Sequence, residues 1–261
     1  MQIEFGRHLK DWRGRRRMSQ LQLALVAEVS ARHVAFLETG RAKPSQAMVL
    51  RLGEALEMPL AARNLMLDAA GFRATYAARP LESEAMAAVK AAIRHIVDNH
   101  APYPAVVLDR HWTVLDGNRP AGAMLAALGL QKGDSLLSLV TEPGRGAALV
   151  ENWPELASHF ISRLRIESAH VGGDSVLDRA ASILAADPAL TGAVQHGDMP
   201  PVLPLRLKVG GDVFPMFSTI TQFGTATDIA LSDIKIEMFF PADAKTKTLF
   251  DELAATGDAD G

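Results

Sequence analysis

The feature that most constrains the fold is a set of three serines, each standing directly before a short helical pattern. Ser19, Ser30 and Ser45 are each followed by apolar residues spaced three or four apart. A serine side chain accepts a hydrogen bond from a free N–H group of the first helical turn, so it is a strong N-cap. Ser19 also has Gln22 three residues later, which makes a capping box. The segment is therefore predicted to form consecutive short helices.

Two further helical patterns lie in the same part of the chain. Phe5, Leu9 and Trp12 fall on one face of a helix before the first serine. Residues 61–70 continue the helical pattern after the third serine. Short connections between such segments are typical of a compact helical unit, so we predict a five-helix domain over residues 1–72.

The pattern changes after this helical segment. Residues 73–81 have no clear period and are predicted to be a linker. Beyond them, short apolar or alternating runs flank a helical middle that is rich in Ala and Leu. This order is typical of an α+β domain with an antiparallel sheet, predicted here over residues 82–250 and followed by a flexible tail over residues 251–261. A turn is expected at Asp116-Gly117-Asn118. The expected strands lie at residues 105–108, 112–115, 205–209, 214–223 and 234–238.

Charge is distributed unevenly between the two predicted domains. Residues 1–80 carry 13 Lys or Arg against 7 Asp or Glu, and the remaining residues carry 14 against 23. A basic domain joined to an acidic one indicates that the two have different partners. Residues 13–17 hold four arginines, although a basic run by itself is most often a solvated helix face.

Composition excludes several classes of function. The chain has no cysteine, which excludes disulfides, thiolate zinc sites, iron–sulfur clusters and a cysteine nucleophile. It has no apolar run of 18 residues, and its first residues lack the order of a signal peptide. We therefore expect no membrane partner and a cytoplasmic location. Because no His-x-x-x-His pair, Gly-x-Ser-x-Gly or phosphate-binding glycine loop occurs, neither a metal site nor enzymatic activity is expected.

A family resemblance rests on spaced positions of the second and third predicted helices, namely Ser19, Gln20, Leu23, Ala24, Val29, Ser30, Val34, Leu37, Glu38, Thr39, Gly40, Arg41, Pro44 and Ser45. This string resembles the phage-repressor type of helix-turn-helix, the XRE family of bacterial regulators, over about residues 5–70. The resemblance implies that the third helix, expected over residues 31–38, enters the major groove of double-stranded DNA.

Candidate DNA contacts lie on the outward face of that helix and beside it. Arg32 can present its guanidinium group to guanine, and Phe36 can touch a thymine methyl group. The alternatives are that Arg32 and His33 are plain surface residues and that Phe36 packs against the fourth helix. The resemblance implies that Gln20 contacts backbone phosphate, and the basic residues after the helix are placed for phosphates too. The predicted DNA-binding residues are Gln20, Ser30, Ala31, Arg32, His33, Phe36, Arg41 and Lys43.

Other positions in this region have structural interpretations. Arg13 and Glu38 match a family ion pair that ties the first helix to the third. Glu28 stands where the family often has glycine, and a left-handed backbone there would cost about 1 kcal/mol. Leu21 and Leu25 stand where the family usually shows polar residues. A second domain or subunit can therefore pack against them.

A second resemblance rests on both ends of the predicted α+β domain, at residues 103–112, Asn118, residues 217–220, Phe223, Gly224, Asp228, Glu237 and residues 239–243. These positions are similar to the ligand-binding domain of MmyB-like regulators, a PAS-like fold, over roughly residues 82–245. The resemblance implies a pocket between helices and sheet for a small apolar, fatty acid-like molecule, and no other cofactor. Composition does not decide between a pocket and a solid core. The candidate pocket residues are Trp112, Met124, Leu125, Phe160, Leu164, Phe217 and Phe239.

The predicted function is a sequence-specific DNA-binding transcription regulator whose C-terminal domain senses a small apolar ligand. One short helix reads too few bases for useful specificity, so we expect a homodimer on a DNA operator. The alternative is an antitoxin-like DNA-binding protein whose C-terminal domain binds a protein partner. Co-purification of a second polypeptide would favour the antitoxin-like alternative.

Overall fold

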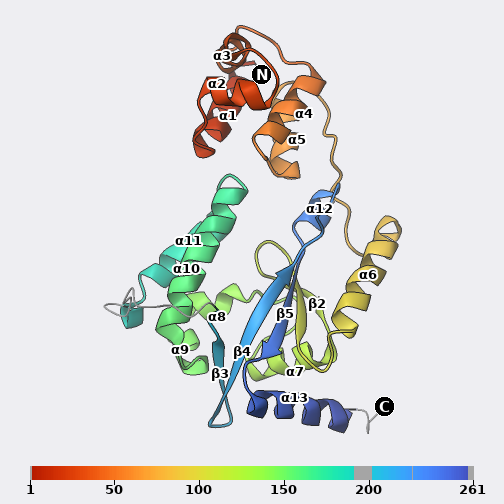
Figure 1. Cartoon of the computed structure of the whole chain (residues 1–261), viewed down its shortest axis with the longest axis vertical. Helices are drawn as coiled ribbons and strands as arrows, with labels where there is room; N and C mark the ends of the chain where they lie inside the picture. The colour runs from red at the N-terminus through yellow and green to blue at the C-terminus, as the bar shows by residue number, and fades with distance from the viewer. Residues whose placement is uncertain (1, 191–201, 225, 258–261) are drawn as a thin grey trace. The chain divides into compact units, whose positions relative to one another are not determined.

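The computed structural model describes residues 2–190, 202–224 and 226–257 (Figure 1). Its contacts divide the chain into two compact units, and the first division falls between Arg79 and Pro80. No helix within these described residues is long and apolar enough to cross a membrane. The first unit consists of Met1–Arg79, Ile166–Ser175 and Ala226–Ser232, and the second of Pro80–Arg165, Val176–Thr225 and Asp233–Gly261.

The first unit begins with five helices, as the sequence predicts. Ser19, Ser30 and Ser45 are the N-cap residues of the second, third and fourth helices. The side chain of each accepts a hydrogen bond from a backbone amide of the first turn, and Ser19 forms the complete capping box with Gln22. The helices are α1 (Gln2–Arg15), α2 (Gln20–Val26), α3 (Ala31–Glu38), α4 (Gln46–Ala55) and α5 (Leu60–Ala69).

One apolar core joins these helices. Phe5, Leu9 and Trp12 on α1 are buried in it, which confirms the predicted apolar face. The turn between α2 and α3 passes through Glu28, whose φ angle of 53° lies in the left-handed region. A side chain at such a position costs about 1 kcal/mol relative to glycine, so this turn carries the strain that the sequence predicted for a left-handed backbone.

The second unit is an α+β domain with an antiparallel five-stranded sheet, which confirms the predicted fold class. The strand order is β2-β1-β5-β4-β3, and each neighbouring pair is antiparallel. The strands are β1 (Ala105–Leu108), β2 (Val114–Gly117), β3 (Leu205–Val209), β4 (Asp212–Thr221) and β5 (Lys235–Pro241).

Helices cover the sheet and connect its strands. In Figure 1, α6 lies on one side of the sheet, and α8, α9 and the first turns of α10 lie on the other. Two short 3₁₀ helices, η1 (Glu84–Met86) and η2 (Pro188–Leu190), accompany the α-helices. The helices that follow η1 are α6 (Ala87–Asp98), α7 (Arg119–Ala127), α8 (Leu137–Thr141), α9 (Arg145–Leu149), α10 (Trp153–His170), α11 (Ser175–Ala185), α12 (Ile229–Ser232) and α13 (Ala244–Gly257).

The register of β4 and β5 assigns their side chains to two different faces of the sheet. Ser218 pairs with Phe239, and Phe217 pairs with Phe240. Because successive side chains of a strand point to opposite faces, these two pairs lie on opposite sides. The rings of Phe217 and Phe240 stack with their centroids 5.2 Å apart. Phe217 is therefore directed away from the face that carries Ser218 and Phe239.

The predicted turn at Asp116-Gly117-Asn118 is wrong. Asp116 and Gly117 belong to β2, and Asn118 is the N-cap of α7. The Asn118 amide group is buried, where its oxygen accepts from the backbone N–H groups of Ala105 and Ala121 and its nitrogen donates to two carbonyls. Gly117 serves close packing, since a Cβ atom there would lie 3.0 Å from the Ala105 carbonyl oxygen. The chain reverses earlier, between β1 and β2.

The predicted tail is also wrong for residues 251–257, because α13 continues to Gly257. The carboxylate of Asp243 caps this helix by accepting from the Thr246 amide at 2.7 Å, and that bond lowers the pKa of Asp243. Phe250 is buried in the core, and Lys247 pairs with Asp251 one turn later. These contacts order the helix although its sequence is polar. Residues 258–261 lie outside the described residues.

Two glycines on α1 provide a matched test of the packing between α1 and α3. A Cβ atom on Gly6 would lie 2.7 Å from the Leu37 carbonyl oxygen, whereas one on Gly14 would meet nothing within 4 Å. Gly6→Ala should lower the free energy of unfolding by about 1–3 kcal/mol, because a backbone neighbour has no room to move. Gly14→Ala should raise it by about 0.5–1 kcal/mol through helix propensity. Urea denaturation measures both, and an equal effect of the two substitutions would contradict the close approach.

Candidate functional site

The helix α3 presents one side to the core and the other to solvent. Val34 and Leu37 are fully buried, as predicted, and this fixes which side faces outward. At its N-terminus the Ser30 hydroxyl accepts from the His33 amide at 3.1 Å. Of the predicted contact residues around α3, Ser30, Arg32, Arg41 and Lys43 are exposed, and Ala31, His33 and Phe36 are half-buried.

The Arg32 and Phe36 side chains contact each other on this outer side. The guanidinium carbon of Arg32 lies 5.2 Å from the Phe36 ring centroid, a cation–π contact between residues one helical turn apart. Phe36 is not part of the apolar core among the described residues. The Phe36 ring is half-buried and lies beside the arginine.

Glu38, at the end of α3, is the centre of a buried polar network. Its side chain is 3% exposed, and Arg13 donates to its two carboxylate oxygens at 2.6 and 3.1 Å. Gln20 donates to the same carboxylate at 2.8 Å. The hydrogen bond with Glu38 is the main reason that the pKa of Arg13 is raised, against the opposing effect of burial. The predicted ion pair is present, and the structure adds Gln20, for which the sequence suggested only a phosphate contact.

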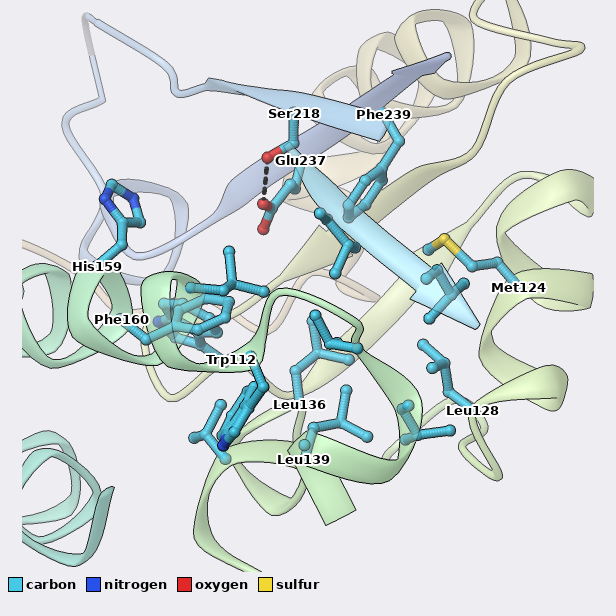
Figure 2. A pocket seen from close by; sticks show the side chains of 18 of the residues that line it. Trp112, Met124, Leu128, Leu136, Leu139, His159, Phe160, Ser218, Glu237 and Phe239 are labelled. Carbon is cyan, nitrogen blue, oxygen red and sulfur yellow. Dashed lines mark hydrogen bonds between the residues drawn. The ribbon is translucent and has the colours of Figure 1, made fainter. Parts of the chain in front are cut away.

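The second unit contains a cavity of about 320 Å³ between the sheet and helices α7 to α10 (Figure 2). Its volume falls within the range of about 300–1,000 Å³ that is typical of small-molecule sites. Five of the seven candidate pocket residues lie in its lining, namely Trp112, Met124, Leu125, Phe160 and Phe239.

Two candidate pocket residues do not line the cavity. Leu164 lies one turn beyond Phe160 on the same side of α10, where it is fully buried in a core cluster with Leu177 and Ala181 of α11. Phe217 stacks on Phe240 at the opposite face of the sheet. Phe217 is excluded by its side-chain direction and Leu164 by its place in the packed core, and apolar composition reveals neither.

Several apolar wall residues were missed by sequence reasoning. They come from α8, α9 and α10, from the strands β1 and β3, and from the connections beside these elements, and β3 is the strand at one edge of the sheet. Leucines are frequent along residues 125–149, but their irregular spacing, at 125, 128, 130, 136, 137, 139 and 149, does not mark the ones that face the cavity. The missed leucines include Leu128, Leu136, Leu139, Leu149, Leu205 and Leu207.

Four polar side chains in the lining gather at one end of the cavity. Ser218 donates to the Oε1 atom of Glu237 at 2.7 Å, and Arg163 Nη1 lies 3.6 Å from the same oxygen. The guanidinium carbon of Arg163 also lies 4.2 Å from the Trp112 ring centroid. Burial, and then the charge of Arg163, lower the pKa of His159. Figure 2 shows the Glu237 carboxylate directed from the sheet into the space that His159 borders from α10.

The fold and the two sites together define a class of protein: a helix-turn-helix DNA-binding domain joined to a domain that encloses an apolar cavity. A family model of the MmyB-like transcription regulator ligand binding domain matches residues 89–253, and one of a helix-turn-helix domain matches residues 4–66. The chain therefore belongs to the MmyB-like family of DNA-binding transcription regulators. Among the residues described, no group of three or more His, Asp or Glu side chains is arranged to hold a metal ion.

Comparison with solved structures finds a similarity to the PAS domain of BvgS from Bordetella pertussis. The two share 15% sequence identity, the match covers 66% of this chain and 98% of that one, and the TM-score is 0.30. The comparison with curated proteins finds no match.

The network around Glu38 predicts the effect of one isosteric substitution. Glu38→Gln removes the carboxylate and leaves the Arg13 guanidinium, whose side chain is 15% exposed, without its counter-ion. The free energy of unfolding should fall by about 3 kcal/mol, because breaking one side of a buried pair leaves an uncompensated charge. Urea denaturation followed by circular dichroism measures the change. The matched control is Glu54→Gln at an exposed position of α4, and a loss as small as the control's would contradict the prediction.

Proposed function

We propose that this transcription regulator binds a fatty acid-like ligand in the cavity of its C-terminal domain and reads a DNA operator through α3. The observation that carries the proposal is the cavity itself, whose lining is apolar except for four polar side chains at one end. An elongated apolar molecule with one polar end matches such a distribution. It would bury its chain among the leucines and keep its head group beside Arg163 and His159.

The energetics of burial favour this class of ligand. Each CH₂ group moved from water into an apolar site contributes about 0.8 kcal/mol. A head group with an acyl oxygen is suited to Arg163, because a guanidinium group is a donor-only partner for such oxygens. A small polar metabolite would leave most of the apolar wall without a matching surface.

For DNA recognition, the exposed Arg32 is proposed to read a guanine edge in the major groove. Phe36 supports its guanidinium and is proposed to lie against a thymine methyl group. Arg41 and Lys43, both exposed after α3, are suited to phosphate contacts. The second amide N–H bond of Gln20 can reach a phosphate while the first remains on Glu38.

The protein is proposed to act as a homodimer in the cytoplasm and to catalyse no reaction. Two copies of α3 would read two half-sites of an operator, and this doubles the number of bases that are recognised. A ligand that binds one dimer geometry more tightly than another would shift the population between them and so alter DNA affinity. The same linkage requires that operator DNA change the affinity for the ligand by an equal factor.

Two arginine substitutions separate base reading from phosphate binding. Arg32→Ala should remove a preference of about 1–3 kcal/mol at one base-pair position of the selected site. Arg41→Ala should weaken binding to all sequences alike and reduce the slope of log affinity against log salt by about one. Selection from a randomised duplex library and salt titrations measure the two effects. Arg165→Ala, an exposed arginine of α10, is the control, and an unchanged base preference in Arg32→Ala would reject its role.

A cavity-filling substitution tests the ligand site. Leu139→Trp places a large ring into the cavity, where it takes space from the acyl chain. Decanoate affinity should fall at least about tenfold, because losing the burial of about two CH₂ groups weakens binding by that factor. Titration calorimetry on the full chain measures the affinity, and native mass spectrometry detects any retained lipid. Leu65→Trp adds the same volume on exposed α5, where Leu65 is 64% exposed. Equal affinities in the two variants would show that decanoate binds elsewhere.

A further inference from the structure

The polar end of the cavity has two walls of opposite hydrogen-bonding character. The sheet contributes Ser218 from β4 and Glu237 from β5, which Figure 2 shows opposite His159 of α10. The helix α10 also contributes Arg163. The two α10 residues are four positions apart and so lie on the same side of that helix. His159 and Ser218 are exposed, whereas the side chains of Glu237 and Arg163 are only 8% and 15% exposed. The charged pair therefore lies deeper than the two neutral groups.

The sheet wall offers hydrogen-bond acceptors. Ser218 donates its single hydroxyl proton to Glu237 Oε1 at 2.7 Å, so its oxygen has only lone pairs left for a ligand. The Glu237 carboxylate is itself an acceptor, and within the described part of the chain no hydrogen bond reaches its Oε2 atom. A ligand that covers this wall must supply hydrogen-bond donors. Without them, the two acceptors lose their hydrogen bonds to water and gain none in return.

The helix wall offers donors. The Arg163 guanidinium has N–H groups and no acceptor. Its plane is held by the Trp112 ring, 4.2 Å from the guanidinium carbon, and its Nη1 atom lies 3.6 Å from Glu237 Oε1, beyond hydrogen-bond distance. The Trp112 ring thus holds the guanidinium beside the Glu237 carboxylate. A ligand oxygen can accept from it while Glu237 stays in place.

We propose that this site selects apolar chains whose head group carries a hydroxyl or amide N–H donor beside an acyl oxygen, in preference to bare carboxylates. The inference rests on the proposed function and narrows its ligand class. The donor binds Glu237, and the acyl oxygen accepts from Arg163. A bare carboxylate places a second anion beside Glu237 and leaves the sheet wall without donors, and both effects weaken its binding.

Two matched pairs of probes with equal acyl chains test the proposal on the full-length protein. 3-Hydroxydecanoate and decanoate are both anions and differ only by a donor-bearing hydroxyl group. Decanamide and methyl decanoate are both neutral, and only the amide has an N–H donor. Titration calorimetry should give a dissociation constant about tenfold or more lower for the donor-bearing member of each pair, since a hydrogen bond to a charged group has that effect.

The substitution Glu237→Gln assigns the effect to one side chain. It removes the negative charge and replaces one acceptor oxygen by a donor. The advantage of 3-hydroxydecanoate over decanoate should shrink to about threefold or less, mainly because decanoate no longer meets an anion. Glu155→Gln, at an exposed position of α10, is the matched control and should keep the wild-type ratio. The wild-type probe series does not depend on how well the variant folds.

Three results would overturn the proposal. Decanoate binding as tightly as 3-hydroxydecanoate, or methyl decanoate as tightly as decanamide, would reject donor selection while leaving the apolar ligand site intact. If a folded Glu237→Gln variant keeps the wild-type ratio of the decanoate and 3-hydroxydecanoate dissociation constants, Glu237 is rejected as the selecting group. Failure of all four probes to bind would reject the fatty acid-like ligand as well, and the proposed function with it.

Discussion

The buried carboxylate of Glu38 is the interaction on which the DNA-binding unit depends. It receives Arg13 from α1 and Gln20 from α2, so one side chain at the end of α3 links the three helices that set the position of the recognition surface. A carboxylate that is 3% exposed requires such partners, because an unpaired buried charge costs several kcal/mol. With this end of α3 fixed, Ser30 and Arg32 at the other end keep a defined direction toward solvent. The outward direction of α3 is thus built on a polar contact among three helices.

The ligand-binding unit depends on a different constraint, the alternation of side chains in the sheet. β5 places Glu237 and Phe239 on the cavity face and Phe240 on the opposite face, so one strand supplies a polar group in the cavity, an apolar wall and outer packing. The helix α10 closes the site with a different period, since His159, Phe160 and Arg163 fall on one side of the helix and line the cavity. A cavity with one polar end follows from these two periodicities.

Local signals explain which parts of the fold could be predicted. The N-caps at Ser19, Ser30 and Ser45 involve residues within three positions of each other, and each formed as the sequence indicated. The strand at residues 205–209 was likewise correct, because alternation is a local pattern. The errors concern residues whose partners are distant. Asn118 looked like part of a turn, but it is buried and bonds to the backbone of residues that precede it by 13 to 21 positions.

The sequence by itself determined the five helices, their caps, the antiparallel sheet and the outward direction of Arg32, since each depends on neighbouring residues or on one helical or strand period. Only the tertiary structure decided that the apolar residues of the second domain leave a cavity of about 320 Å³, that Leu164 is packed in the core and that Phe217 faces away from the cavity. It also brought Arg163 to Glu237 across 74 positions of the chain. The physical reason is that burial energy depends on apolar area and not on shape, so composition specifies how much core there is but not where space remains.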